Sequence, residues 1–301
     1  GILIKSKYKK YGLRANIDAQ TFDWLNINFE VNGSHDESNK NHNNITGVGG
    51  AIWQGLTYSP TLDLIDKDGN WVRDNVSSYQ DNPYGKRMQD LDDQLSNFFG
   101  GNIKFTIDLP VKGLSLNIIG SSHQRSLKTY NMYSKEKNLS YKNSAYNSEE
   151  EWASLQNTNQ LTYTNKWGDH RLTATVVAEY MQNTYNQLYI GVDDLLTESV
   201  GYWNLGLGSV NGFGNSYSKS TLASYLGRAM YQLKDKYLFT ATLRRDGSSK
   251  FQGDNKWGFF PSFALAWKLK NESFFYNVNA ITQLKLRVGY GTTGQSAVSP
   301  Y

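Results

Sequence analysis

Cysteine is absent from the 301 residues of this chain. Its absence excludes disulfide bonds, a thiolate metal site and a cysteine nucleophile. No stretch is long and apolar enough to predict a membrane helix, which needs about 20 apolar residues. The sequence therefore lacks the signs of a disulfide-bonded scaffold, a cysteine enzyme or a helical membrane protein.

A strong charge of one sign is also missing. The formal net charge is +4 and the pI is near 8.9, which is too mild to indicate a nucleic-acid partner. Lysine and arginine are scattered except for Lys5, Lys7, Lys9 and Lys10. We interpret that cluster as a solvated chain end, and we predict no nucleic-acid binding.

Aromatic residues are abundant where aliphatic residues are sparse. Aromatics make up 14% of the chain, Tyr alone contributes 21 residues, and hydrophobic residues reach only 39%. Tyr and Trp favour the membrane interface, where a flat apolar ring lies beside a polar tip. A Tyr-rich soluble carbohydrate-binding protein has the same composition, so composition leaves both classes open.

Alternation of apolar and polar residues recurs in about ten stretches. In residues 25–31, Leu25, Ile27 and Phe29 alternate with Asn26 and Asn28. Side chains on a strand alternate between faces, so each such stretch has one apolar and one polar face. A soluble sandwich gives this pattern, and so does a transmembrane barrel with lipid outside and a polar lumen inside.

The connector lengths favour the barrel. The predicted strands are roughly 8–20, 23–36, 97–109, 113–129, 156–167, 169–187, 219–234, 236–249, 257–270 and 282–292. Short connectors (20–23, 110–113, 167–169 and 234–236) alternate with long ones (36–96, 129–155, 187–218 and 250–257), and the tenth strand follows residues 271–281. Outer-membrane barrels have short turns at one end and long loops at the other. The sequence therefore predicts an all-β, antiparallel up-and-down transmembrane β-barrel segment.

Polar faces of these strands carry charged residues that are candidates for the barrel lumen. The candidates are Arg14, Asp18, Glu30, Lys104, Asp108, Arg228, Lys285 and Arg287. They either face a plug or substrate or form a structural charge ladder inside the barrel. Around residue 228, alternation predicts Ala223, Tyr225, Ala229 and Tyr231 outward and Ser224, Arg228 and Gln232 inward. Pro261 predicts a bulge or the first paired residue of its strand.

Several runs resemble one known family. They are Leu243-Arg-Arg-Asp-Gly-Ser-Ser-Lys-Phe251, Lys256-Trp-Gly-Phe-Phe-Pro-Ser262 and Leu284-Lys-Leu-Arg-Val-Gly-Tyr-Gly-Thr-Thr-Gly294, with Tyr58-Ser-Pro-Thr-Leu62, Asp66-Lys-Asp-Gly-Asn70 and Asn82-Pro-Tyr84 before them. Their order and spacing over about 240 residues resemble the SusC/RagA-type TonB-linked outer-membrane proteins, which are TonB-dependent transporters.

The resemblance implies a barrel of about 22 strands with an N-terminal plug and a TonB box. Residues 1–301 contain neither, and we expect them to supply about ten strands of that barrel as a fragment. The implied function is import of glycans, oligosaccharides or peptides across the outer membrane of a Gram-negative bacterium. The implied partners are outer-membrane lipid, a SusD-like surface lipoprotein, and TonB through the missing N-terminal region.

Other candidate sites are few. His35, His42, His123 and His170 have no metal-ligand spacing, no Gly-x-Ser-x-Gly motif is present, and 66–70 is expected to be a tight turn. We predict no enzyme activity, no metal and no cofactor. Aromatic faces bind sugar C–H surfaces, so residues of the 36–96 loop are candidates for glycan contact or for packing on the rim: Trp53, Tyr58, Trp71 and Tyr79.

Two alternatives to the importer stay open from the residues themselves. One is a soluble all-β carbohydrate-binding protein, and the other is a non-transport barrel such as an adhesin or an enzyme. Ten strands also suffice for a small closed barrel. We expect an open, curved sheet instead, because a narrow ten-stranded lumen would desolvate the charged inner side chains.

Overall fold

The computed structural model describes residues 4–39, 51–76, 80–136, 140–275 and 278–295. Two short helices, α1 (Ala51–Thr57) and α2 (Pro83–Gln89), lie in the first long loop, and no described helix is long and apolar enough to cross a membrane. The strands are β1 (Lys7–Phe22), β2 (Leu25–Asn39), β3 (Leu91–Asp108), β4 (Leu114–Tyr133), β5 (Ser144–Trp167), β6 (His170–Asp193), β7 (Ser209–Leu233), β8 (Tyr237–Ser248), β9 (Trp257–Trp267) and β10 (Leu286–Gly291).

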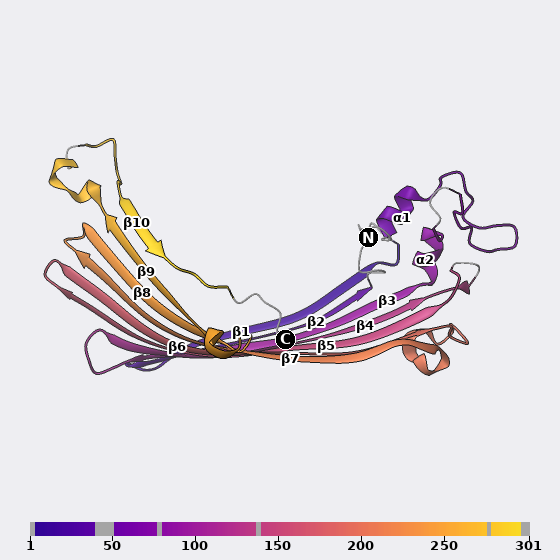
Figure 1. Cartoon of the computed structure of the whole chain (residues 1–301), viewed down its shortest axis with the longest axis horizontal. Helices are drawn as coiled ribbons and strands as arrows, with labels where there is room; N and C mark the ends of the chain where they lie inside the picture. Colours follow the sequence, from indigo (N-terminus) through magenta and orange to yellow (C-terminus); the bar gives the residue numbers. More distant parts are fainter. Residues whose placement is uncertain (1–3, 40–50, 77–79, 137–139, 276–277, 296–301) are drawn as a thin grey trace.

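The ten strands form one antiparallel sheet whose spatial order follows the sequence. Figure 1 shows that the sheet curves around a hollow and that α1 and α2 lie over the concave side at one end. β1 and β10 are the two edges of the sheet and do not pair with each other over their described residues. The predicted open, curved sheet is confirmed, and a closed ten-stranded barrel is excluded for this chain.

A single row of paired residues illustrates the apolar face. Consecutive pairings join Leu25, Ile107, Leu116, Leu161, Val176, Gly227, Leu243 and Pro261 across β2 to β9. Register keeps the members of such a row on one face, because side chains alternate with a period of two. This row of the sheet is therefore apolar across eight strands.

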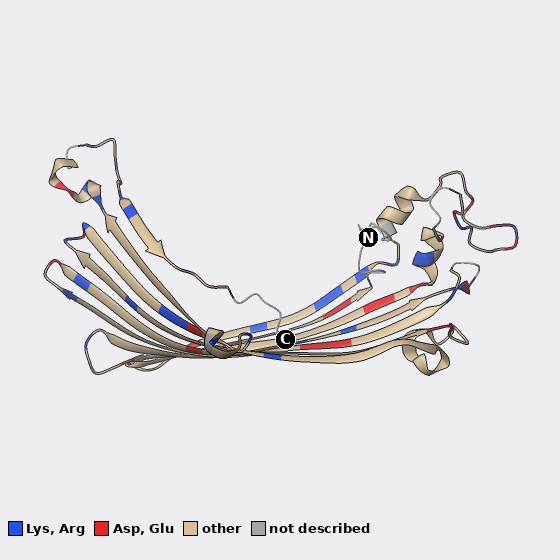
Figure 2. Cartoon of the chain, in the orientation of Figure 1, with Lys and Arg blue, Asp and Glu red and all other residues tan. Residues whose placement is uncertain are grey.

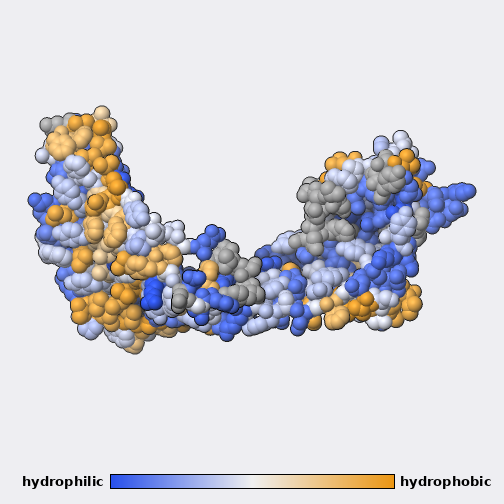
Figure 3. Space-filling model, in the orientation of Figure 1, coloured by the Kyte–Doolittle hydropathy of each residue, from blue (hydrophilic) through white to orange (hydrophobic). Residues whose placement is uncertain are grey.

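The next row illustrates the polar face. Consecutive pairings join Asp108, Ser115, Thr162, Thr175, Arg228, Thr242, Ser262 and Gly291 across β3 to β10. Residues 292–295, which follow β10 into the hollow in Figure 1, line a cavity together with Arg228 and Thr242. The polar face is thus the concave one, and the apolar face is convex. In Figure 3, hydrophobic residues gather at the lower left and lower right of the convex margin, and hydrophilic residues cover much of the hollow.

Two rows of aromatic rings border the apolar convex face. Near the short turns, Phe22 stacks on Trp24 with ring centroids 5.4 Å apart, and similar contacts join Trp167 to His170 and Tyr237 to Trp267. Toward the long loops, the rings that stack are Tyr11 with His35 and Tyr225 with Trp257. Aromatic rows of this kind border the apolar band of outer-membrane barrels.

The band between these rows is slightly shorter than the apolar band of outer-membrane barrels, which is about 25 Å tall. Tyr237 and Arg245 lie eight residues apart on β8, which is about 27 Å along a strand and about 20 Å along the axis of a barrel tilted by about 40°. Among the described strand residues between the rows, no convex position carries Lys, Arg, Asp or Glu. The absence of charged side chains from the described positions of this band is what a lipid-facing surface requires.

A small apolar core lies outside this band. Residues 194–208 fold back on the loop ends of β4, β5 and β6, where Met132, Ala145, Val192, Leu195 and Tyr202 form a buried cluster. Most other large apolar side chains of the described residues are exposed or half-buried. Because the chain buries so little apolar surface in itself, its convex face depends on an apolar environment for stability.

Several strands extend further toward the loops than the sequence predicts. Residues 144–155 and 209–218 were expected to lie in long loops, yet they continue β5 and β7 in unbroken ladders. Both faces of the sheet are polar at many positions there, so alternation gives no signal. Pairing with neighbours holds these segments, as with the ion pair between Lys128 Nζ and Glu149 Oε1 at 2.7 Å.

Pro261 corrects a second expectation. It lies within β9, opposite Leu243 of β8, with no register shift, so the predicted bulge or strand start is wrong. Its carbonyl accepts a hydrogen bond from Thr292 N at 3.0 Å, just beyond the last β9–β10 pair, Ser262–Gly291. Proline has no N–H group to donate. The donor would have faced β10, at a position where pairing with β10 has already ended.

Candidate functional site

The concave face is a dense arrangement of charged and amide side chains. Arg14 pairs with Glu30, and Asp18 accepts a hydrogen bond from Asn26 Nδ2 at 2.8 Å. By register, the predicted lumen residues that share this face are Arg14, Asp18, Glu30, Lys104, Asp108, Arg228 and Arg287. Lys285 lies immediately before β10. Figure 2 shows acidic and basic residues interleaved along the strands, so neither sign dominates this surface.

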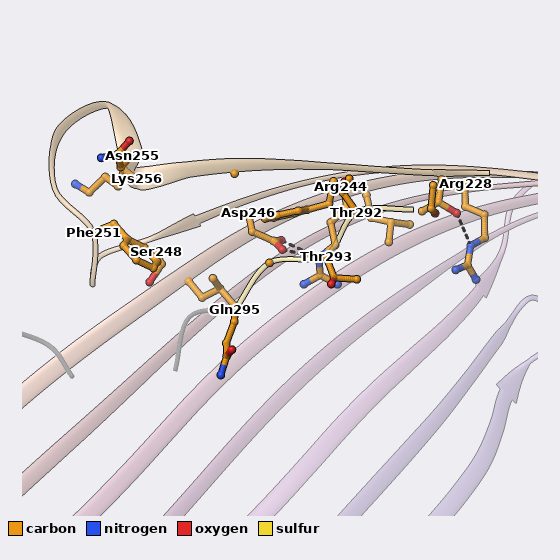
Figure 4. A pocket seen from close by; sticks show the side chains of 17 residues that line it. Arg228, Arg244, Asp246, Ser248, Phe251, Asn255, Lys256, Thr292, Thr293 and Gln295 are labelled. Atoms are coloured by element: carbon orange, nitrogen blue, oxygen red, sulfur yellow. Dashed lines mark hydrogen bonds and ion pairs between the residues drawn. The ribbon is translucent and has the colours of Figure 1, made fainter. Parts of the chain in front are cut away.

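A cavity of about 610 Å³ lies on this face over the middle of β7 and the loop ends of β8 and β9. Its polar lining includes Arg228, Arg244, Asp246 and Lys256, and residues 292–295 cover it from the side of the hollow (Figure 4). Gly294 allows this close approach, because a Cβ atom there would lie 2.3 Å from Cζ of Phe260. The cavity thus depends on the close passage of the segment that follows β10.

Electrostatics in the cavity favour a ligand rich in hydrogen-bond acceptors. Arg244 Nε donates to both carboxylate oxygens of Asp246 at 2.8 Å, and its Nη2 donates to Ser224 Oγ at 3.3 Å. Arg228 Nε donates to Thr242 Oγ1 at 3.1 Å and has no described carboxylate partner. Guanidinium groups bind carboxylates, sulfates and phosphates in a fork geometry. The available donors of Arg228 therefore suit an anionic or hydroxyl-rich group.

The aromatic residues of the first long loop mostly hold that loop together. Tyr58 and Trp71 are 9% and 8% exposed. The Tyr58 hydroxyl donates to the Val72 carbonyl, and Trp71 Nε1 donates to Gln89 Oε1 at 2.6 Å. Trp53 is half-buried in α1, and Tyr79 lies outside the described residues. Tyr58 and Trp71 therefore present little surface to a ligand.

Residues 66–70 form the predicted tight turn. Asp66 Oδ1 accepts hydrogen bonds from the backbone N–H groups of Asp68 and Asn70, and Gly69 has a positive φ of 82°. The Asp66 carboxylate is thus occupied by backbone donors. No cluster of three potential metal ligands occurs among the residues that the structure describes.

Asp90 is an unusual carboxyl at the end of α2. It is 6% exposed and accepts a hydrogen bond from Ser134 N at 2.9 Å. Burial raises its pKa to about 7, and the charges of Asp81 and Glu198 add to the effect. The folded loop therefore binds the Asp90 proton more tightly than the unfolded chain does.

The raised pKa of Asp90 predicts a pH-dependent contact between α2 and the β4–β5 loop. Its stabilising contribution should be full below pH about 4 and should fall as pH rises through about 7, because the folded form binds the proton more tightly. Amide-exchange protection factors near Ser134 should decrease over that range. In an Asp90→Asn variant they should stay constant, and an equal pH dependence in both proteins would contradict the assignment.

Three functional features escape sequence reasoning. Arg244 and Asp246 belong to a run that resembles the family, but only the pairing of β7 with β8 shows that they share a face with Arg228. Residues 292–295 reach the same cavity from beyond β10, which no periodicity could indicate. The sequence did hold one signal for this grouping: strand alternation places residues 244 and 246 together on the face opposite Arg245.

Comparisons with known proteins agree with this architecture. Residues 21–300 match the family model described as TonB dependent receptor-like, beta-barrel. TonB-dependent receptor P26 of Formosa agariphila is 30% identical over 309 aligned positions, covering 100% of this chain and 30% of that protein. TonB-dependent receptor SusC of Bacteroides thetaiotaomicron is 54% identical over 81 residues, which are 27% of this chain and 8% of SusC.

Solved structures show the same fold. The RagAB peptide transporter superposes with a TM-score of 0.82 at 19% identity, over 98% of this chain and 34% of that chain. The unliganded ferric citrate transporter FecA superposes with a TM-score of 0.52 at 8% identity, over 88% of this chain and 34% of that chain. This chain thus spans about a third of the length of the full-length relatives. With ten strands in one open sheet and a family match over nearly its whole length, the chain belongs to the TonB-dependent receptor β-barrel family.

Proposed function

We propose that this chain forms part of the barrel wall of an outer-membrane importer for large nutrients in a Gram-negative bacterium. The observation that carries the proposal is the sorting of the two faces, since the described strand residues place no charged side chain in the convex band and many on the concave face. Lipid on one side and water on the other would produce this sorting. The family match supports a transport role for the wall.

The substrate in this proposal is an oligosaccharide or a peptide. Similarity to SusC and to the RagAB peptide transporter supports that class. The concave donors, with Arg14, Lys104 and Arg228 among them, would face either the substrate or a plug inside the lumen. Of the described candidates for glycan contact, Trp53 is half-buried and keeps some surface for contact, whereas Tyr58 and Trp71 would act by holding the loop in place.

The partners in this proposal follow from the same relatives. A SusD-like surface lipoprotein would deliver substrate to the loop end, where α1 and α2 lie. TonB would supply energy through a region outside this chain. We assign no catalytic role to the described residues, and an assay for glycan or peptide hydrolysis is expected to show no activity.

Cysteine labelling tests which face meets water. This chain has no cysteine, so each single substitution adds one reporter to it in the complete receptor assembled in the outer membrane, and labelling of the unsubstituted receptor gives the background. Met230→Cys, on the concave face and 41% exposed, should react with a membrane-impermeant maleimide, whereas Ala241→Cys and Val176→Cys, on the convex face, should not. Equal labelling of all three would contradict a lipid-facing convex surface.

Uptake tests the transport function separately. Cells that express the complete receptor should accumulate a labelled oligosaccharide or peptide, and deletion of TonB should abolish the accumulation. Uptake that persists without TonB would contradict an energised importer, and a receptor that binds glycan without any uptake would favour a binding or adhesive role.

A further inference from the structure

Arg245 is the charged residue that borders the apolar convex band on β8. Its paired neighbours are Tyr225 on β7 and Phe259 on β9, which place it on the convex face. It follows Leu243 along that face, at the level of the loop-side aromatic row. An arginine at the bilayer midplane costs about 2–4 kcal/mol, but at the interface the cost falls to about 0–1 kcal/mol. The position of Arg245 is therefore that of an interface residue.

The side chain of Arg245 is held among aromatic rings. Its guanidinium carbon lies 4.8 Å from the centroid of the Trp257 ring, and Trp257 stacks on Tyr225 at 6.2 Å. Such a contact orients the guanidinium plane and leaves its edge donors available. Arg245 is exposed, so these donors are accessible from outside the sheet.

No described carboxylate neutralises Arg245. The adjacent Asp246 lies on the opposite face, where both of its oxygens bind Arg244, and the ion pairs of the described residues do not include Arg245. The second arginine over a tryptophan, Arg125 over Trp152 at 5.2 Å, lies on the polar face instead. Arg245 thus combines an unpaired cation, an aromatic platform and an apolar band directly beneath it.

We infer that Arg245, Trp257 and Tyr225 bind the phosphate group of an outer-leaflet lipid whose acyl chains lie on the convex band. The guanidinium edge would donate to phosphate oxygens, the rings would pack on the adjoining sugar or glycerol backbone, and apolar positions such as Leu243 would contact the chains. This inference rests on the proposed membrane location, but it does not depend on what the receptor transports.

Lipid retention during purification tests the inference. The complete receptor is purified in detergent with diphosphorylated lipid A, and bound lipid is counted by native mass spectrometry. We expect the wild-type receptor to retain the phosphorylated lipid and Arg245→Gln to lose about tenfold in affinity, the size expected for one charge-assisted hydrogen-bonded pair. Arg125→Gln is the matched control and should bind like wild type.

Two further measurements distinguish binding of a lipid phosphate from binding of free inorganic phosphate. Dephosphorylated lipid A should bind wild type as weakly as phosphorylated lipid A binds Arg245→Gln, and millimolar inorganic phosphate should not displace the lipid. Equal retention of both lipid forms by wild type would overturn the inference, as would displacement by inorganic phosphate alone. A receptor that retains neither lipid also overturns it, and failure of substrate uptake with lipid retention intact would count against the transport function only.

Discussion

Replacing Ala229 with arginine is expected to lower the free energy of unfolding of the assembled receptor by about 2–4 kcal/mol. Ala229 lies on the convex face of β7, between Tyr225 and Tyr231 of the two aromatic rows. A guanidinium at this depth cannot reach water easily and has no described anionic partner on that face. Equilibrium unfolding in liposomes, or mobility on unheated gels, measures the loss.

The adjacent position provides the control. Met230 lies on the concave face, and Met230→Arg should change stability by about 0.5 kcal/mol or less, since its charge would enter a polar, hydrated surface. The two variants carry the arginine at adjacent positions of β7, on opposite faces of the sheet. A similar loss in both would mean that the arginine harms the strand itself and would contradict a lipid-facing convex side.

Replacing Asn82 with alanine is expected to unfold the first long loop without melting the sheet. Asn82 is fully buried, its Oδ1 accepts from Gly85 N at 2.9 Å to cap α2, and its Nδ2 donates to the carbonyls of Leu64 and Val72. The cap is worth about 1 kcal/mol and each further hydrogen bond about 1 kcal/mol. A local loss of about 3 kcal/mol should speed amide exchange in residues 51–76 about a hundredfold.

An exposed residue of the same loop is the reference for that measurement. Lys67 is exposed in the turn after Asp66, and Lys67→Ala should leave exchange in residues 51–76 unchanged. Exchange in β5 and β6 should match wild type in both variants, because their ladders do not involve the loop. If Asn82→Ala left the loop as protected as in wild type, the network around Asn82 would not be what holds it.

Alternation predicted the architecture where one face meets an apolar environment. In β7, Tyr225 and Ala229 fall on the convex side and Arg228 on the concave side, as the sequence predicts. The strand continues over residues 209–218, where polar and small residues occupy both faces and periodicity disappears. A strand of that kind is specified by its neighbours rather than by its own sequence, so its length could not be predicted from the chain alone.

The candidate site was less predictable than the fold. Tyr58 and Trp71 were candidates for glycan contact because aromatic rings bind sugars, but in the structure both are buried in the loop, where Tyr58 bonds to Asn82 and Trp71 to Gln89. Burial in a loop depends on contacts between segments, which composition does not reveal. The cavity at Arg228 and Arg244 required the pairing of β7 with β8 and the passage of residues 292–295 across β9.

A distance between the edge strands tests the central claim, which is that these ten strands are an arc of a wider barrel. Spin labels at Ile17 on β1 and Val288 on β10 both lie on the convex face, and pulsed electron resonance on the complete receptor measures their separation. Nine inter-strand steps of about 4.8 Å predict a separation of roughly 30 Å or more. A separation of about 10 Å or less, as for labels on paired neighbours, would show that β1 and β10 close on each other and would contradict the account.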